Sequence, residues 1–381
     1  MPGKGVNVIE PDLGFIRQII DSGGETLMKC FQCGNCTAVC EVTQDEGPFP
    51  RKEMVWAQWG LKDRLLADPN IWSCHQCNDC TTHCPRGAKP GDVFSAIRNI
   101  SFAHYGAFGL GKFFTSPRYL PVLFLIPVAL IALAIGVASK DGFISMKPIV
   151  FSNMMPVPAI DAVFLPAVIF AFVAALAGVG RFWKNMKSNS GDKGPSPGAI
   201  IPASVKVVMG VLTHNKMRKC VTNAPRVRSH LALMYGFIAL MATTSAVALM
   251  YWINKLGIAD VAVTPLALTH PVKILGNLGA LLAFTGIALM LARRFGPESD
   301  EAGKLGYYDR FFLIVTFWTV VTGILSEIFR LMDTASLAYF IYYVHLVFVF
   351  TLIVYFPFSK FAHLLYRFAA MTFAGAMEKG K

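Results

Sequence analysis

The sequence predicts an all-α protein in two parts, a small helical head followed by a bundle of six transmembrane helices. Three observations predict this fold class. Hydrophobic residues make up 54% of the 381 residues and charged residues only 15%, so the chain is more apolar than an average soluble domain. Six long apolar stretches follow residue 118. The first quarter instead carries two runs of four cysteines, and the apolar residues near them recur at helical spacing.

The cysteine runs have the spacing of iron–sulfur ligands. They read Cys30-x-x-Cys33-x-x-Cys36-x-x-x-Cys40 and Cys74-x-x-Cys77-x-x-Cys80-x-x-x-Cys84. Two-residue gaps let three thiolates face one cluster, whereas the cysteine after the longer gap is carried too far round and reaches the partner cluster. We therefore assign Cys30, Cys33, Cys36 and Cys84 to one [4Fe–4S] cluster, and Cys74, Cys77, Cys80 and Cys40 to the other.

Structural zinc and disulfides are the alternatives for these cysteines. Zinc sites use two cysteine pairs rather than four cysteines in one tight run, and disulfides need an oxidising compartment. The ninth cysteine, Cys220, is left over, and we expect it to be a thiol without a role. Between and beside the runs, residues 51–66 and 93–102 carry apolar residues at helical spacing. We therefore expect an all-α two-cluster ferredoxin head.

Six stretches have about the 20 apolar residues needed to cross a bilayer. They lie at 119–138, 161–182, 231–253, 271–292, 311–330 and 336–358. The domains that follow are a head at 1–105, a linker at 106–118 interrupted by glycines, a transmembrane di-haem domain at 119–363 and a tail at 364–381. Residues 200–216 predict an amphipathic helix, which either lies on the membrane surface or docks a partner subunit.

Charge predicts the orientation in the membrane. Lysine and arginine are sparse in 139–160 and 254–270 but dense in 183–230, so both chain ends should lie in the cytoplasm. The first 29 residues contain no secretory hydrophobic stretch. The net charge of +12 is then explained by topology and by contact with the anionic lipid bilayer. It gives no reason to expect a nucleic acid partner, and the predicted location is the cytoplasmic membrane.

Four of the eight histidines fall at or near the ends of predicted spans: His230, His270, His345 and His363. Eighteen residues, or five turns, separate His345 from His363, which places the two rings on one helix face about 27 Å apart. A histidine inside a span needs a partner for its nitrogens. We therefore predict two bis-histidine b haems, one between His230 and His363 on the cytoplasmic side and one between His270 and His345 on the periplasmic side.

The alternative for each of these histidines is a ring that simply lies among lipid headgroups. The remaining four histidines are not expected to bind iron. His75 and His83 lie between cluster ligands and should shape local hydrogen bonding. We expect His104 and His214 to be surface residues.

Taken together, these residues resemble a known arrangement over nearly the whole chain. The paired cysteine runs resemble the small iron–sulfur subunit of heterodisulfide reductases. The membrane part, with histidines eighteen residues apart on its last helix, resembles the b-type cytochrome subunits of that family and of respiratory nitrate reductases. A fusion of the two is similar to the membrane subunits of quinone-interacting membrane-bound oxidoreductases of sulfate reducers. The nitrate reductase pattern takes both partner histidines from one helix, and here His270 on the next helix must substitute for the second.

The resemblance implies an electron conduit. It implies soluble flavoprotein partners, similar to the A subunit of heterodisulfide reductase, that dock on the head, and a route that ends at adenylylsulfate reductase. The twin-cysteine motif of the disulfide-reducing subunit is missing, and so are dinucleotide and flavin motifs. The leading hypothesis is that menaquinol is oxidised in the bundle and that electrons pass through the haems and clusters to a flavoprotein. Its rivals are the reverse reaction, in which quinone is reduced, and a haem-free membrane anchor.

A quinol site needs a proton acceptor in an apolar cleft. Glu327, with Arg330 close behind it, lies at the periplasmic end of the fifth span, and an ionisable residue at that depth is a functional candidate. An interfacial ion pair between Glu327 and Arg330 that anchors the helix end is an equally good interpretation.

Overall fold

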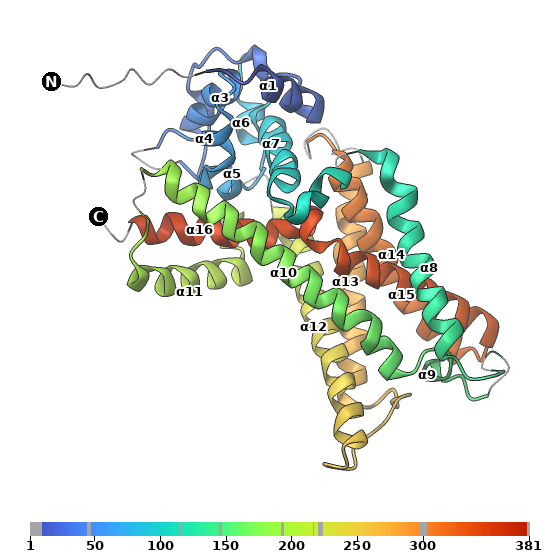
Figure 1. Cartoon of the computed structure of the whole chain (residues 1–381). Coiled ribbons are helices and arrows are strands. Elements are labelled where there is room, and N and C mark those ends of the chain that lie inside the picture. The colour runs from blue at the N-terminus through green and yellow to red at the C-terminus, as the bar shows by residue number, and fades with distance from the viewer. Residues whose placement is uncertain are drawn as a thin grey trace.

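The computed structural model describes residues 10–43, 47–114, 116–142, 144, 147–191, 194–215, 217–219, 224–296 and 303–378. Every regular element in these ranges is a helix, which confirms the predicted fold class. The chain folds into a head of short helices that lies at one end of a set of long helices (Figure 1). Cys220 lies outside the described residues.

The head consists of short helices joined by loops that carry the cysteines. Its helices are α1 (Leu13–Ile19), α2 (Asn35–Ala38), α3 (Arg51–Gln58), α4 (Lys62–Leu66), α5 (Pro69–Ser73), α6 (Asp79–Thr82) and α7 (Pro90–Tyr105). Regular α-helix stops at Tyr105 and resumes at Leu120. Between them, Phe108 and Gly109 both have positive φ, so the chain turns sharply in the segment expected to be the linker.

Within the described ranges, six helices are long and apolar enough to span a membrane. They are α8 (Leu120–Ala138), α10 (Val157–Asn189), α12 (Ala224–Lys255), α13 (Pro271–Phe295), α14 (Tyr307–Leu331) and α15 (Ala335–Val354). All six predicted spans lie mainly within these helices. Many large apolar side chains on them face outward, as Leu133 and Val137 do at 68% and 81% exposure. An apolar surface of this extent fits contact with lipid.

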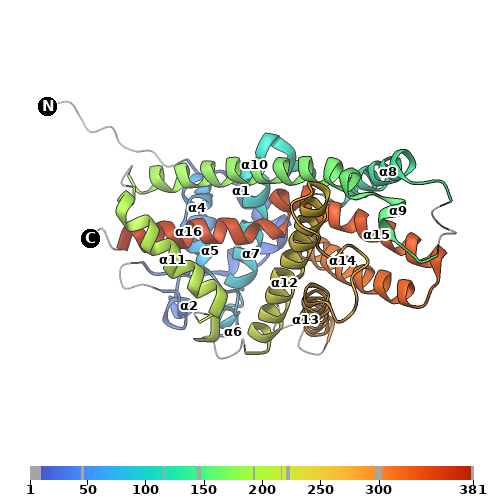
Figure 2. The ribbon, with the colours of Figure 1, turned by 90° about the horizontal axis from the view of Figure 1, so that it is seen from below.

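The remaining α-helices of the described residues are α9 (Phe151–Met154), α11 (Pro197–Thr213) and α16 (His363–Glu378). The amphipathic helix expected near residues 200–216 corresponds to α11. The segment 364–381, expected to be a tail, forms most of α16, whose Tyr366, Ala370 and Phe373 are buried. Figures 1 and 2 show α10 and α16 passing along the head, so both helices connect it to the bundle.

The head and the bundle share one hydrophobic core. Trp72 of α5 stacks on Tyr366 of α16 with ring centroids 5.1 Å apart, and it meets Phe182 of α10 edge-on at 6.3 Å. The backbone of α10 comes so close to the head at Gly178 that an added Cβ would lie 2.9 Å from the carbonyl oxygen of Tyr105. These contacts fix the position of the cysteine loops relative to the long helices.

Candidate functional site

The eight cysteines of the two runs line two hollows in the head. The Cys74 hollow is lined by Cys40, Cys74, Cys77 and Cys80. The Cys30 hollow is lined by Cys30, Cys33, Cys36 and Cys84. The last cysteine of each run thus lines the hollow of the other run, which is the grouping that we assigned from the spacing.

The two runs fold alike because each combines positive-φ turns with a short helix. Gln32 and Gly34 in the first run, and Gln76 and Asn78 in the second, have positive φ at matching positions. Glycine and asparagine tolerate this conformation better than other residues do. Helices α2 and α6 begin directly after Gly34 and Asn78 and carry the third cysteine of each run. The turns therefore direct the thiols of each run towards a common space.

Without iron, the buried cysteines would keep their protons. Burial is the largest cause that raises the pKa of Cys36 and of Cys40 to about 11, which favours the neutral thiol, whereas the iron of a bound cluster would deprotonate these groups. Backbone N–H groups of Gln76 and Ala88 donate to the Sγ atoms of Cys74 and Cys84, both at 3.3 Å. Hydrogen bonds of this kind tune the potential of iron–sulfur centres.

The described cysteines are spread around each hollow. Among the residues that the structure describes, no group of three or more His, Cys, Asp or Glu side chains is arranged to hold a single metal ion. A zinc site requires four ligands that converge on one ion. A [4Fe–4S] cluster needs no such convergence, because each of its four thiolates binds a different iron. Four cysteines line each hollow, which is the number of thiolates that one [4Fe–4S] cluster takes.

Two of the predicted haem ligands meet where the bundle joins the head. The rings of His230 (α12) and His363 (α16) have centroids 6.4 Å apart and an interplanar angle of 82°. A metal–imidazole bond is about 2 Å long, and the ring centre lies about 1 Å further away. Two imidazoles on opposite sides of one iron would therefore have centroids about 6 Å apart, so the spacing of this pair fits bis-histidine ligation.

Both imidazoles have their Nδ1 atoms engaged. Nδ1 of His363 lies 2.5 Å from the carbonyl oxygen of Lys360, so this nitrogen carries the proton and Nε2 keeps its lone pair. Nδ1 of His230 lies 2.8 Å from Nε2 of His214. Histidines that bind metal commonly hold the other ring nitrogen in such a hydrogen bond, which fixes the orientation of the ring. Burial, together with the nearby cations Lys360, Arg367 and Arg98, lowers the pKa of His363 to about 4, so the ring is neutral at physiological pH.

The structure corrects our expectation for His214. We expected a surface residue, but its exposure is 7%. It caps the C-terminus of α11 in a left-handed conformation, with φ of 52°, and this turn folds the ring back against His230. His104 is exposed, as expected. His75 is buried and contacts the guanidinium of Arg367, while Nδ1 of His83 lies 2.9 Å from the carbonyl oxygen of Asp79.

The other predicted pair is not brought together. Nδ1 of His345 lies 3.1 Å from the carbonyl oxygen of Thr319 and 3.2 Å from Oγ1 of Thr322, both on α14. Nδ1 of His270 instead accepts from the backbone N–H of Val272 at the start of α13. Within the described part of the chain, the rings of His270 and His345 make no contact. In this tautomer His270 carries its proton on Nε2, so the pairing stays a prediction to which the geometry adds no support.

Two arginines connect the imidazole pair to the cysteines. Arg226, one turn before His230, donates from Nη1 to the carbonyl oxygens of His75 and Gln76 at 2.8 and 2.7 Å. Arg367, one turn after His363, donates from Nη1 to the carbonyl oxygen of Cys74 at 3.2 Å. Residues four apart lie on the same helix face. In the sequence, an arginine and a histidine lie four residues apart on each of these two helices. This spacing could have predicted the link between histidines and cysteines, but our sequence-based predictions did not use it.

Glu327 lies in an ion-pair network rather than in an open cleft. Its carboxylate contacts Nζ of Lys273 on α13 and lies 3.2 Å from Nη2 of Arg330. The predicted pair of Glu327 with Arg330 is therefore present, and Lys273 is an additional partner that sequence reasoning did not find. The three side chains are 16–22% exposed.

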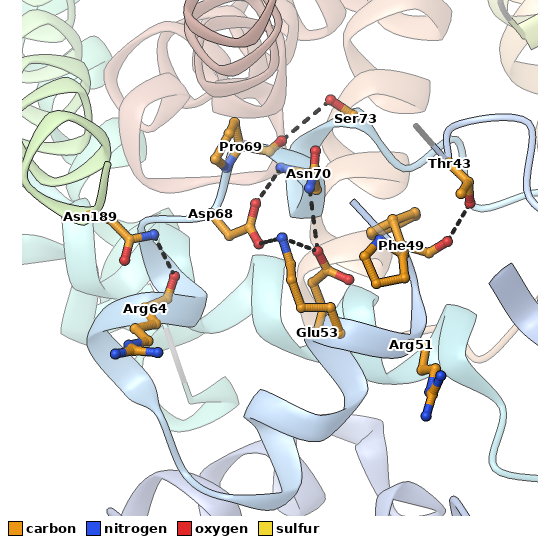
Figure 3. Close-up of polar contacts among 12 residues, drawn as sticks. Thr43, Phe49, Arg51, Glu53, Arg64, Asp68, Pro69, Asn70, Ser73 and Asn189 are labelled. Atoms are coloured by element: carbon orange, nitrogen blue, oxygen red, sulfur yellow. Dashed lines mark hydrogen bonds and ion pairs between the residues drawn. The ribbon is translucent and has the colours of Figure 1, made fainter. Parts of the chain in front are cut away.

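A buried polar network supports the head between the two cysteine runs. Glu53 and Asp68 are almost fully buried, and Nζ of Lys52 lies 3.1 and 3.2 Å from their carboxylates. Asn70 joins them: its backbone N–H donates to Asp68 at 2.8 Å and its side chain donates to Glu53 at 3.4 Å (Figure 3). Burial and the neighbouring charge of Asp68 raise the pKa of Glu53 to about 8.

The fold and the site define an iron–sulfur redox protein with a bundle of six long apolar helices. Comparison with protein families agrees with this class. Residues 26–88 match the family model of a 4Fe-4S dicluster domain, which supports [4Fe–4S] clusters in the head. Residues 115–380 match the family model of citrate utilization protein B. This match covers more than half of the chain, and the chain belongs to the citrate utilization protein B family.

The curated relatives match the head. They include a protein of Archaeoglobus profundus that is named as similar to the C subunit of heterodisulfide reductase, 39% identical over 88 residues, or 23% of this chain and 47% of the relative. Another is the C subunit of the H(2):CoB-CoM heterodisulfide,ferredoxin reductase of Methanothermobacter marburgensis, also 39% identical over 88 residues, 23% of this chain and 48% of the relative. The chain spans about half the length of these relatives. No solved structure matches it significantly.

Proposed function

We propose that this chain is the membrane electron-transfer subunit of a quinone-dependent oxidoreductase complex. It oxidises menaquinol and delivers the electrons, by way of two b haems and two [4Fe–4S] clusters, to cytoplasmic flavoprotein partners similar to the A subunit of heterodisulfide reductase. The route leads towards adenylylsulfate reductase. The head faces the cytoplasm and the bundle lies in the cytoplasmic membrane.

One observation carries this proposal. The helices that bring His230 and His363 together also hold, through Arg226 and Arg367, the backbone of the loop that bears Cys74 and Cys77. A redox centre on the imidazole pair would therefore be connected to the Cys74 hollow by a few side chains. The names of the head's relatives describe subunits of larger reductases, which supports partner subunits for this chain as well.

The residues present fit the proposed cofactors to different degrees. The eight cysteines suit two [4Fe–4S] clusters, with Cys40 and Cys84 exchanged between the runs. His230 and His363 would hold one b haem, whose iron would supply a one-electron carrier. For the second haem, Nδ1 of His345 is held by a hydrogen bond, and His270 would have to leave its capping position to pair with it.

Glu327, at the far end of the bundle from the head, is the proposed proton acceptor for quinol, with Arg330 and Lys273 positioning its carboxylate.

The test is an anaerobic visible spectrum of the purified full-length protein after addition of a menaquinol analogue. We expect b-type bands that become reduced, and the loss of a haem in His363→Ala. Haem that dithionite reduces but menaquinol does not would contradict the quinol step. Absence of haem bands would overturn the histidine assignment and leave the two clusters standing.

A further inference from the structure

A group of cations lies between the imidazole pair and the cysteine loop. Its members, which we call the cation group, are Arg98 of α7, Arg226 of α12, Lys360 just before α16, and Arg367 of α16. Arg226 and Arg367 each lie one turn from a histidine of the pair, and the carbonyl oxygen of Lys360 contacts His363. Arg98 donates to the carbonyl oxygen of Ile71 and the side-chain oxygen of Gln76, at 3.1 and 3.0 Å. The group therefore surrounds the head-facing side of the histidines.

The contacts of Arg98 and Arg226 leave their positive charge in a partly buried place. Arg98 and Arg226 donate to carbonyl and amide oxygens, which carry no net charge. Of Arg98, Arg226 and Lys360, only Lys360 contacts a carboxylate of the described residues, that of buried Asp309. Cations taken out of water need anionic partners to offset the lost hydration. The arrangement therefore calls for an anion close to the pair.

Phenylalanine rings also lie beside the histidine pair. Phe312 lies 6.4 Å from the His363 ring, centroid to centroid, and it packs against Phe361 at 4.6 Å. Phe237 of α12 meets Phe361 at 5.9 Å. The two imidazoles thus have both phenylalanine rings and cations close to them. A ligand that fits both kinds of neighbour has a large flat apolar body with acidic groups along one edge.

We propose that the cation group binds the two carboxylate side chains of the haem held by His230 and His363. This inference rests on the proposed function, because it requires haem on this pair. Haem b carries both carboxylates on one edge of an otherwise apolar ring. Arginine binds carboxylates through its planar fork of N–H groups. With the carboxylates among the cations, the apolar ring meets Phe237, Phe312 and Phe361, and no acid is buried in the bundle.

The principal test compares Arg226→Gln with the wild-type full-length protein. We expect haem transfer to apomyoglobin to be about tenfold faster, since one charge-assisted hydrogen bond is worth about that factor. The midpoint potential of this haem should fall, because loss of a nearby positive charge disfavours the electron-rich state. The resonance Raman bands of the haem carboxylates should shift. Arg226→Lys keeps the positive charge but not the planar fork of N–H groups. Its haem midpoint potential should therefore stay close to the wild-type value, while its haem transfer to apomyoglobin should be faster than in wild type.

Arg310→Gln is the matched control, because Arg310 is an exposed arginine in the first turn of α14. It should leave the haem release rate, the potential and the Raman bands unchanged. Wild-type values for all three in Arg226→Gln would overturn the inference. So would a variant in which only the signal of an iron–sulfur cluster changes, because the cations would then serve the cluster. If His363→Ala leaves the haem spectrum unaltered, the proposed function itself fails, which is a distinct result.

Discussion

Glu53 is a carboxylic acid in the interior of the head, and its protonation connects pH to stability. Its pKa is raised from an ordinary value of 4.5 to about 8, first by burial and then by the negative charge of Asp68. Between these two pH values the folded state holds a proton that the unfolded state releases. The contribution of this group to the free energy of unfolding is therefore complete below pH 4.5, and it is lost as the pH rises towards 8.

We predict that Glu53→Gln stabilises the protein at alkaline pH. An amide cannot ionise, so the variant should be more stable than wild type by about 1–3 kcal/mol at pH 9 and nearly equal to it at pH 5. The measurement is thermal unfolding of the full-length protein in nanodiscs at both pH values. Glu25→Gln is the control, because Glu25 is exposed and its ion pair with Lys304 lowers its pKa. Equal pH dependence in Glu53→Gln and wild type would contradict the prediction.

Glu327→Gln tests the proposed proton acceptor. The amide keeps the shape of the side chain but cannot take a proton, so quinol oxidation should slow by tenfold or more, the usual scale of general-base catalysis being about 100-fold or above. Haem content should stay at the wild-type level. Asp333→Asn is the matched control, since Asp333 forms an exposed ion pair with Lys147. Unchanged turnover in Glu327→Gln would leave the residue as a structural anchor of α14.

At the residue scale, the sequence predicts features that depend on residues only a few positions apart in the chain. The grouping of the cysteines followed from gaps of two and three residues. The contact of Lys273 with Glu327 joins residues 54 positions apart on different helices, and no local pattern reports it. The burial of His214 depends on a single left-handed residue at a helix end, which hydropathy does not reveal.

At the scale of the elements, helices α12 and α13 approach each other closely at two glycines. A Cβ added at Gly236 would lie 2.4 Å from the backbone nitrogen of Ala283, and one at Gly286 would lie 2.4 Å from that of Leu233. Small residues allow helix backbones to approach in this way inside membranes. Leu233 lies almost one turn from His230, so this contact also positions the histidine pair.

We predict that Gly286→Ala destabilises the bundle. The added methyl group meets backbone atoms that cannot move aside, so the helices must separate, at a cost of about 1–3 kcal/mol. Thermal unfolding followed by circular dichroism in nanodiscs measures the loss. Gly180→Ala on α10 is the control, because an added Cβ there has nothing within 4 Å. Equal stability of the two variants would show that α12 and α13 are not held together at this point.

The sequence predicts the six long helices well because length and hydropathy alone define them. It is less informative where a helix continues past the apolar stretch. Helix α10 extends to Asn189, beyond the predicted end at 182, because Asn185 and Asn189 bind the head at Tyr105 and Arg64. Helix α16 buries one face against the head, as Tyr366 does against Trp72. Because the sequence alone does not show the surface of the head that covers this face, the segment resembled a tail.

At the scale of the whole molecule, the two cysteine hollows differ in position. Because head and bundle share one core, one hollow lies close to the histidine helices and the other lies closer to the protein surface. The Cys74 hollow is next to the arginines that extend from the histidine helices. The Cys30 hollow includes the exposed Cys33, and Phe31 beside it is 67% exposed. Electrons from the bundle should therefore enter at the Cys74 hollow and leave from the Cys30 hollow.

This order can be tested with one serine substitution in each hollow. Cys33→Ser should leave the centre of the Cys74 hollow reducible by menaquinol, while transfer to a soluble acceptor falls by an order of magnitude or more. Cys77→Ser should prevent menaquinol from reducing either centre, although dithionite still reduces the one in the Cys30 hollow. Electron paramagnetic resonance of freeze-quenched full-length protein distinguishes the two centres. The opposite pattern would mean that the exposed hollow receives electrons first, and that the arginines of α12 and α16 hold the head in place without defining the route.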